Sequence, residues 1–325
     1  MAEKEILLKR TGTAQTVELR EKNGVPFMVF PALEATGVVV HGCSTRLGGV
    51  SQGDCATMNF AHGRGDDPAN IRENFIRMTA ALGVAPEQLV LSHQTHTTNI
   101  RQVTAEDLGK GYDKERDYQD IDGLMTDVPG AVLVTSYADC VPLLFVDPVR
   151  RAIASSHAGW RGTVSGMGRR TVEAMKEAYG CDPKDLIVAI GPSICQDCYE
   201  VSEDVAEEFA RELGLTLPVE ESGARETAQT GKEDIPDTYG ETSTILKKTP
   251  GKEGKYQLDL WQANRKILVE AGVLPEHITI TDVCTCCNKE VIFSHRGSQG
   301  RRGNMGVFLS LKEDGCNENE GAFIR

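Results

Sequence analysis

The sequence has few basic residues, few histidines and no long apolar run, and each shortage excludes a class of protein. Lys and Arg number 35 against 48 Asp and Glu, so the formal net charge is −13 and the pI is near 5.1. This balance disfavours a nucleic-acid-binding surface, which needs a basic face. No stretch reaches the roughly 18 apolar residues of a membrane helix, and the N-terminal residues lack a signal-peptide segment. We therefore expect a soluble cytoplasmic protein whose partners include neither nucleic acid nor membrane.

Histidine and cysteine usage narrows the chemistry further. The seven histidines include no His-x-His pair, which argues against a multicopper oxidase, because such enzymes bind several coppers through many paired histidines. The ten cysteines are more typical of thiols or metal ligands than of disulfides in a cytoplasmic protein. Apparent strands and helices follow one another without strict alternation. We therefore predict an α+β fold, a single domain over residues 1–325, with helices packed on mixed β-sheets.

A β-hairpin predicted within residues 135–163 carries the strongest chemical signal. Two apolar runs flank an Asp-Pro turn. If Val146 pairs with Arg151, Cys140 lies opposite His157, with the two Cβ atoms about 4.5–5.5 Å apart on one face. A thiolate and an imidazole at that separation can share a metal ion. A buried cysteine packed beside a core histidine explains the same pattern equally well.

A third metal ligand is available upstream, in the segment LVLSHQTHTTNI. His96 and His93 flank the same Gln-Thr pair, and the spacing does not choose between them. Two histidines and one cysteine, with a fourth position left to water, are typical of a catalytic zinc site rather than a structural one.

Several motifs, in this order, resemble those of the YfiH-type, or laccase-domain, family, whose members are often labelled polyphenol oxidases or peptidoglycan editing factors. The resemblance covers about residues 35–311. The motifs are HGCSTRLGGVSQG (41–53), QTH (94–96), ADCVPLLFVDP (138–148), HAGWRGT (157–163), IGPSICQDCYEV (190–201) and CTCC with FSHRG (284–297).

The resemblance implies a YfiH-like fold and a metal site formed by His96, Cys140 and His157. It selects His96 as the upstream ligand, with zinc as the expected metal, although copper can also bind such donors. Zinc-dependent deamination, one of the reactions that the resemblance implies, needs a carboxylate as proton shuttle. Asp139 is the obvious candidate, but strand alternation points its side chain away from that of Cys140. Asp122 is a second candidate.

Three arginines in glycine-bearing motifs are candidate anion ligands, because guanidinium groups match phosphate oxygens. Arg46 stands before a Gly-Gly turn, and Arg161 lies at the start of a predicted helix, where backbone N–H groups also attract anions. Arg296 forms a locally basic patch with Arg301 and Arg302. The resemblance places Arg46 near the active site.

The resemblance implies a purine nucleoside phosphorylase that accepts inosine, guanosine, adenosine and methylthioadenosine and also deaminates adenosine. Purine nucleosides and phosphate are therefore the expected partners, while the sequence predicts no oligomeric state. One alternative is a peptidoglycan-precursor editing hydrolase that cleaves a UDP-muramyl-amino acid, with Cys140 as nucleophile and His157 as base. The other is the copper-dependent polyphenol oxidase of the traditional family label.

Helix signals are clear in four places. An acidic cap with Pro68 begins one helix, which Gly83 ends. Others are predicted over 163–179, from Ser202 onward and over 259–271. Residues 219–255 are polar and lack a strand or helix period, so we predict a surface insertion there.

Two cysteine groups remain, Cys195-x-x-Cys198 and the segment that holds Cys284, Cys286 and Cys287. Together they could bind a second, structural zinc ion. The spacing of the second group differs from that of a usual zinc knuckle. We therefore expect buried, reduced thiols instead.

Overall fold

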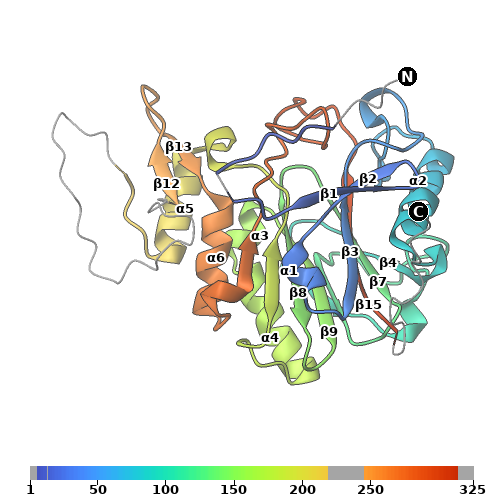
Figure 1. Cartoon of the computed structure of the whole chain (residues 1–325). Coiled ribbons are helices and arrows are strands. Elements are labelled where there is room, and N and C mark those ends of the chain that lie inside the picture. The colour runs from blue at the N-terminus through green and yellow to red at the C-terminus, as the bar shows by residue number, and fades with distance from the viewer. Residues whose placement is uncertain (1–5, 13, 219–244, 314–325) are drawn as a thin grey trace.

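The computed structural model of the protein describes residues 6–12, 14–218 and 245–313. Two six-stranded β-sheets pack face to face, with helices on both outer sides (Figure 1). The strands of the first sheet, in spatial order, are β1 (Glu18–Lys22), β2 (Val25–Val29), β3 (Val39–Ser44), β15 (Met305–Leu311), β7 (Val132–Tyr137) and β4 (Leu89–Leu91).

The second sheet contains the predicted hairpin at its centre. Its strands, in spatial order, are β14 (Ile278–Ile280), β10 (Ile187–Ile190), β8 (Val141–Asp147), β9 (Ala152–Ala158), β6 (Gly123–Thr126) and β5 (Ile100–Gln102). A small third sheet has the order β11 (Glu200–Ser202), β13 (Lys255–Leu258) and β12 (Leu246–Lys248). Both large sheets mix parallel and antiparallel pairs.

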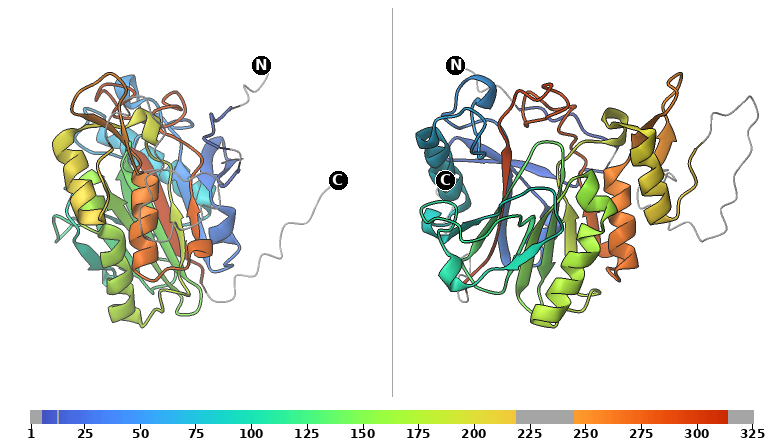
Figure 2. Two further views of the ribbon diagram at one scale, coloured as in Figure 1. Left: turned by 90° about the vertical axis from the view of Figure 1, so that its left-hand side faces the viewer. Right: turned by 180° about the vertical axis from the view of Figure 1, so that it is seen from behind.

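The described ranges contain six α-helices. They are α1 (Pro31–Glu34), α2 (Pro68–Leu82), α3 (Trp160–Val164), α4 (Met167–Tyr179), α5 (Glu203–Leu213) and α6 (Leu260–Glu270). Helices α4 and α6 lie side by side against the second sheet, whereas α2 covers the first sheet from the opposite side (Figures 1 and 2). Mixed sheets with packed helices confirm the α+β prediction.

Strand β8 shows why the core has this layered form. Leu144 and Val146 contribute to the core between the two sheets, and the alternate residues Leu143 and Phe145 pack in the core beneath α4 and α6. All four side chains are fully buried. A strand that is buried on both faces reads as a continuous apolar run, as this segment does.

Helix α2 follows its local sequence signals closely. The Asp67 carboxylate accepts a hydrogen bond from the Ala69 N–H at 2.8 Å, Pro68 is the first helical residue, and Gly83 ends the helix at φ 76°. These are the preferred residues for an N-cap, a first turn and a C-cap. Phe75 lies on the buried face.

The helix predicted over residues 163–179 is confirmed from Met167 to Tyr179, but a separate short helix precedes it. Helix α3 ends at Val164 and α4 begins at Met167, with Gly166 at φ 76° between them. That left-handed conformation suits glycine and interrupts the helical hydrogen bonds. The break turns α3 and its N-terminal residues toward the end of β9.

The predicted register of the hairpin is also wrong, by two residues. Val146 pairs with Ile153 rather than with Arg151, and Pro142 pairs with His157. The Asp147 carboxylate accepts hydrogen bonds from two N–H groups within the loop, whose last residue has a φ of 50°. A shift of two preserves which face each side chain occupies. Cys140 therefore stays on the same side of the hairpin as His157, although not directly opposite.

The predicted insertion ends earlier than residue 255. Strand β12 and the first residue of β13 fall within it, and Leu246 is buried in the core shared with Tyr256. Residues 219–244 of the predicted insertion lie outside the described residues.

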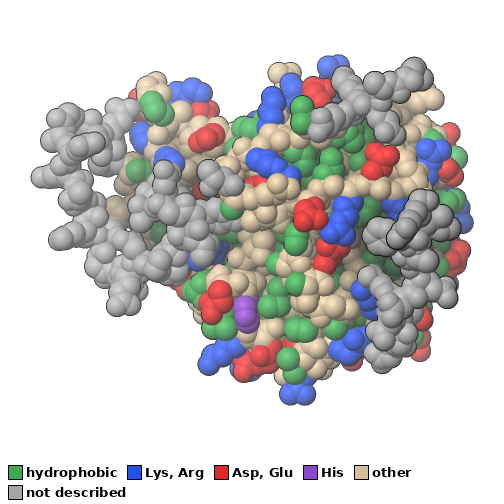
Figure 3. Space-filling view, in the orientation of Figure 1, with side chains coloured by type: hydrophobic (Ala, Val, Ile, Leu, Met, Phe, Trp, Pro, Cys, Tyr) green, Lys and Arg blue, Asp and Glu red, His purple; other side chains and the backbone are tan. Residues whose placement is uncertain are grey.

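The described surface carries both signs of charge. On the face shown in Figure 3, basic and acidic side chains are intermixed over the two sheets and their helices. None of the helices in the described ranges is long and apolar enough to cross a membrane.

Candidate active site

A buried carboxylate, Asp122, organises the residues around the end of β9. Its two oxygens accept hydrogen bonds from the backbone N–H groups of Thr95, His96 and Thr97 at 3.1, 3.0 and 2.9 Å. The Thr97 hydroxyl donates a further bond at 2.9 Å. Asp122 also lies 2.7 Å from Nδ1 of His157. One carboxylate thus fixes both the backbone that carries His96 and the ring of His157.

The two histidine rings lie together as a result. The His96 and His157 ring centroids are 4.9 Å apart with an interplanar angle of 22°, and Tyr137 packs 5.4 Å from the second ring. Because Asp122 takes Nδ1 of His157, Nε2 is the nitrogen left for another partner. The other upstream histidine, His93, accepts a bond from the Asp120 N–H through Nδ1 instead.

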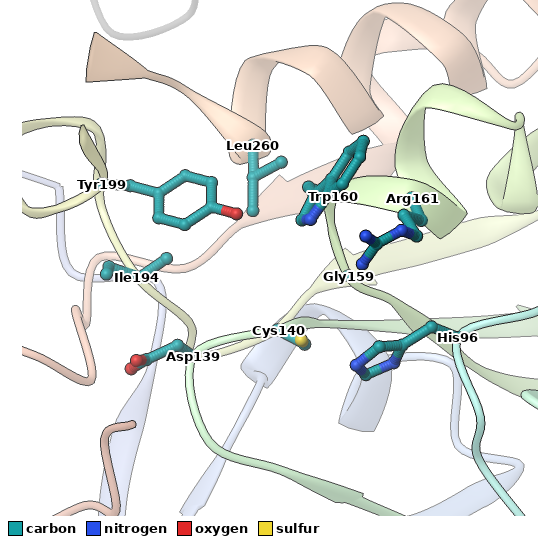
Figure 4. A pocket seen from close by; sticks show the side chains of 9 residues that line it. All are labelled: His96, Asp139, Cys140, Gly159, Trp160, Arg161, Ile194, Tyr199 and Leu260. Carbon is teal, nitrogen blue, oxygen red and sulfur yellow. The ribbon is translucent and has the colours of Figure 1, made fainter. Parts of the chain in front are cut away.

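Cys140, the residue directly before β8, lies beside the His157 ring. A Cβ placed on Gly159 would lie 3.1 Å from the Cys140 sulfur and 3.8 Å from Cε1 of His157, and Cys140 hydrogen-bonds the His157 ring. Glycine at position 159 leaves the sulfur room beside the ring. Figure 4 shows the Cys140 sulfur and the His96 ring directed toward each other at the base of one cavity.

This donor set fits a metal ion. Ligand atoms of His96, Asp122 and His157 lie within 4.8 Å of one another. Both oxygens of Asp122 are already used by N–H and O–H donors, however, so Asp122 is better placed to orient His157 than to bind a metal itself. Cys140, which hydrogen-bonds His157, is a further candidate donor beside this group.

The same contacts perturb the pKa values of the site. Burial lowers the pKa of His157, but the adjacent Cys140 and Asp122 outweigh it and raise that pKa to about 9. Burial raises the pKa of Asp122, but the hydrogen bond from His157 and those of the Thr95–Thr97 backbone lower it to about 2. Burial, with the charge of His157, lowers the pKa of His96. The pair Asp122–His157 therefore carries opposite charges when no metal is bound.

Asp139 lines the cavity, but its carboxylate points away from the Cys140 sulfur (Figure 4). One oxygen accepts a 2.6 Å hydrogen bond from the Thr285 hydroxyl and the other a 2.6 Å bond from the Arg296 N–H. These bonds fasten the segment around Cys140 to a distant part of the chain. The geometry therefore favours a structural role for Asp139 over that of a proton shuttle.

The predicted arginines separate into two groups. Arg161 lines the cavity and packs over Trp160, 4.3 Å from its ring centroid. Arg46 instead donates to the Ala56 and Lys289 carbonyl oxygens at 2.8 and 2.9 Å. Arg46 is not among the residues that line the cavity.

Arg296 likewise has protein partners. Its guanidinium donates to the Cys198 and Glu200 carbonyl oxygens at 3.3 and 3.1 Å. It lies over the ring of Tyr199, outside the lining of the cavity.

Arg302, which the sequence analysis placed only in a general basic patch, lies near the metal-ligand set. Burial and the neighbouring charge of Arg64 lower the pKa of Arg302 to about 10, and its Nε is buried without a hydrogen-bond partner. Its charge also helps lower the pKa of His96, after burial and His157. The guanidinium groups of Arg64 and Arg302 repel each other, and Nε of Arg302 has no acceptor. A bound anion would offset this repulsion and accept that hydrogen bond.

The rest of the cavity is mostly apolar, and the sequence analysis missed it. Trp160, Ile194, Tyr199 and Leu260 form its upper walls (Figure 4). Including the open solvent at its mouth, the cavity measures about 390 Å³. Trp160, Ile194 and Tyr199 fall within the sequence motifs given above, but no local signal places Leu260, the first residue of α6, in the same cavity.

Known proteins of similar sequence have been assigned activities on purine nucleosides. Purine nucleoside phosphorylase YlmD of Geobacillus stearothermophilus is 35% identical over 276 residues, which are 85% of this chain and 91% of that protein. A purine nucleoside phosphorylase of Deinococcus radiodurans is 34% identical over 288 residues, 89% and 94% of the two chains. An adenosine deaminase from an unknown prokaryotic organism is 31% identical over 233 residues, 71% and 78%.

Solved structures and a family model indicate the same family as these relatives. The crystal structure of YlmD from Geobacillus stearothermophilus has a TM-score of 0.75 at 30% identity and covers 91% of this chain and 99% of that chain. The Bacillus licheniformis protein YfiH has the same TM-score at 29% identity, with 90% and 99% covered. The family model described as multi-copper polyphenol oxidoreductase laccase matches residues 40–312. As its motifs predicted, the chain belongs to this laccase-domain, or YfiH-type, family.

Proposed function

We propose that the protein is a zinc-dependent purine nucleoside phosphorylase that also deaminates adenosine. The observation that carries the proposal is a single cavity in which His96, Cys140 and Arg161 meet beneath apolar walls. Both reactions need a metal-ligand set and a surface for the base, and phosphorolysis also needs a cation for phosphate. The activities named for the relatives support the same reading.

Zinc is the metal that the donor set suits best. Two imidazoles and one thiolate, with a fourth position open, form a catalytic zinc site, and Asp122 supplies the usual second hydrogen bond to a histidine ligand. A blue-copper site would add a weak axial methionine, and no methionine is among the described residues that line the cavity. When bound, zinc acts as a Lewis acid toward the reacting group.

The walls of the cavity suit a purine nucleoside. Trp160 and Tyr199 provide large aromatic surfaces for a planar base, and Ile194 and Leu260 exclude water around it. The stack of Arg161 on Trp160 holds that cation at the edge of the same space. Base and anion therefore meet within one cavity.

In phosphorolysis, a phosphate oxygen attacks C1′ of the ribose, the bond from C1′ to the purine nitrogen breaks, and its electron pair leaves with the base. Arg161 and Arg302 hold the phosphate and offset its charge. In deamination, water adds at C6 of adenosine and ammonia leaves. Only phosphorolysis requires the anion, so the two reactions depend differently on the arginines.

The experiment follows both products from the purified protein. Inosine with phosphate should give hypoxanthine and ribose-1-phosphate, measured by chromatography, and omission of phosphate should stop hypoxanthine release. Adenosine without phosphate should still give inosine. Cys140→Ala should abolish both reactions. Hypoxanthine release that does not depend on phosphate would show that the reaction is hydrolysis.

Arginine variants identify the phosphate ligand. Arg161→Ala should lower phosphorolysis about ten- to a hundredfold, the value of a lost charge-assisted contact, and should spare deamination. Arg169→Ala is the matched control, because Arg169 lies nearby on α4 in an exposed ion pair with Glu270. The same assay on Arg46→Ala tests the phosphate role that the sequence gave to Arg46. Equal loss of both reactions in Arg161→Ala would contradict its assignment.

A further inference from the structure

Four cysteines from two distant segments meet in a cluster that the proposed reactions do not use. Cys195 is the N-cap and Cys198 the last residue of the short 3-10 helix η4 (Gln196–Cys198), and Cys284 and Cys287 follow β14. Their sulfur atoms all lie within 4.8 Å of one another, and the sulfurs of Cys198 and Cys287 are 3.5 Å apart. All four cysteines are free.

The cluster corrects the sequence interpretation of these residues. Cys284 and Cys287 form the second pair, with the same Cys-x-x-Cys spacing as Cys195 and Cys198, and Cys286 is the extra residue between them. The spacing of the second pair is therefore usual for a zinc knuckle, contrary to the expectation from sequence. Isolated reduced thiols would have no reason to converge in two matched pairs.

The size of the cluster fits one metal ion. Zinc binds cysteine sulfur at about 2.3 Å in a tetrahedron, which places the four sulfurs roughly 3.8 Å from one another. The 3.5 Å separation of the Cys198 and Cys287 sulfurs is close to that edge. It is far longer than the ~2.05 Å of a disulfide bond.

The backbone around the cluster is organised to receive thiolates. The N–H groups of Cys195 and Cys287 donate to the Cys284 sulfur at 3.3 and 3.5 Å. Ser193 bridges to Cys284 through the backbone, and the Ser193 carbonyl accepts a 3.0 Å bond from the Thr285 N–H. N–H donors stabilise negative charge on a sulfur. The two segments are thus held in register independently of their side chains.

Four thiolates whose sulfur atoms all lie within 4.8 Å of one another would repel each other without a cation between them. A divalent metal supplies that charge to all four sulfurs at once.

We propose that Cys195, Cys198, Cys284 and Cys287 bind one structural zinc ion, separate from the site of His96, Cys140 and His157. Four thiolates leave no position open to a substrate, so the site fastens chain segments and performs no chemistry. A tetrahedral site of four sulfurs selects zinc or iron among common metals. The active site differs from this four-sulfur site, because its proposed ligands combine nitrogen and sulfur donors.

The proposed zinc site supports the wall of the substrate cavity. Ile194 and Tyr199, which line the cavity, lie directly beside the first cysteine pair. Thr285, within the second pair, donates the hydrogen bond that holds Asp139. If the proposed nucleoside reactions are correct, loss of this zinc should raise KM more than it lowers kcat.

Metal content of the full-length protein tests the proposal without reference to activity. Elemental analysis should find about two zinc ions per chain in the wild type and about one in Cys140→Ala, because each site binds a single ion. Cys198→Ser should also retain about one. Cys286→Ser is the matched control and should keep both ions, because Cys286 lies in the same segment outside the cluster.

A spectroscopic measurement covers the case in which Cys198→Ser fails to fold. Cys140→Ala loaded with cobalt should show the intense sulfur-to-cobalt absorption and visible bands of a tetrahedral site with four thiolates. Iron at the cluster, a disulfide between Cys198 and Cys287 in freshly purified protein, or cobalt absorption without thiolate bands would each overturn the proposal.

Discussion

Asp122 connects backbone conformation, histidine orientation and charge through a single side chain. Its oxygens accept bonds from three consecutive N–H groups, from the Thr97 hydroxyl and from His157. The bond to its N–H holds His96 at a φ of 67°, a conformation that non-glycine residues rarely adopt without such support. At the scale of one residue, Asp122 therefore determines where the two proposed histidine ligands lie.

Asp122→Asn should weaken metal binding about ten- to a hundredfold, the usual cost of losing the partner of a histidine ligand. The amide can keep the shape of the side chain but not its charge toward His157. Competition with a chromophoric chelator measures the zinc affinity. Asp120→Asn is the control, since exposed Asp120 bonds the neighbouring Thr95 hydroxyl at 2.7 Å. Equal zinc affinity in Asp122→Asn and the wild type would remove Asp122 from the site.

The roles that sequence reasoning identified and those that it missed differ in how far along the chain the partners lie. Cys140 and His157 belong to one hairpin, so alternation along the strands was enough to bring them together despite the error in register. The partners of Asp122 lie 25 to 35 residues away. Nothing local to Asp122 could therefore reveal that its carboxylate is surrounded by donors.

At the scale of elements, local signals predicted the ends of helices better than the register of strands. Asp67, Pro68 and Gly83 define α2 through interactions within a few residues. The hairpin loop is instead displaced by one residue along the chain, because Arg151 ends it with a φ of 50° and Ala152 then pairs with Asp147. A positive φ at arginine has no signal in the sequence, because glycine or asparagine would be expected there.

The loop after β5 depends on one buried carboxylate, Asp107. It accepts bonds from Arg101 at 2.7 Å, from Lys110 at 2.8 Å and from the Thr104 N–H at 2.9 Å. Burial raises its pKa, but these partners outweigh burial and lower the pKa to about 2. A depressed pKa means that the stabilisation is present above the ordinary value near 3.9 and is lost as pH falls through 2.

Asp107→Asn should lower the free energy of unfolding at pH 7 by about 1–2 kcal/mol, less than the full shift implies because its partners are partly exposed. The difference between variant and wild type should shrink as pH falls from 5 toward 2. Urea denaturation across that range measures it. Asp117→Asn is the control, because Asp117 bonds Lys110 but is 62% exposed. A difference that does not change with pH would contradict the electrostatic explanation.

At the scale of the whole molecule, the elements form four layers, with a hydrophobic core between each two neighbouring layers. Helix α2 covers the first sheet, the two sheets enclose a second core, and α4 and α6 cover the second sheet. Phe60, Phe75 and Phe308 meet edge to face between α2 and the first sheet, with centroid separations of 5.0 to 6.2 Å. The active site lies at the ends of β8 and β9, where these layers hold both strands.

Phe308→Ala should lower the free energy of unfolding by about 3–5 kcal/mol, because Phe308 is fully buried and its removal leaves a cavity between two layers. Urea denaturation followed by circular dichroism measures this loss. Ile76→Ala on α2 is the control, since Ile76 is 41% exposed and should cost little. Similar losses in the two variants would show that α2 does not seal this layer.

The position of β15 affects how the chain folds while the ribosome synthesises it. This strand lies between β3 and β7 and pairs with both. At ~5–20 residues per second, synthesis from the end of β7 to the start of β15 takes roughly ten to thirty seconds. Throughout that interval two apolar strands have unpaired edges that invite wrong partners. Both edges therefore stay unpaired until β15, the last strand of the described chain, has been synthesised.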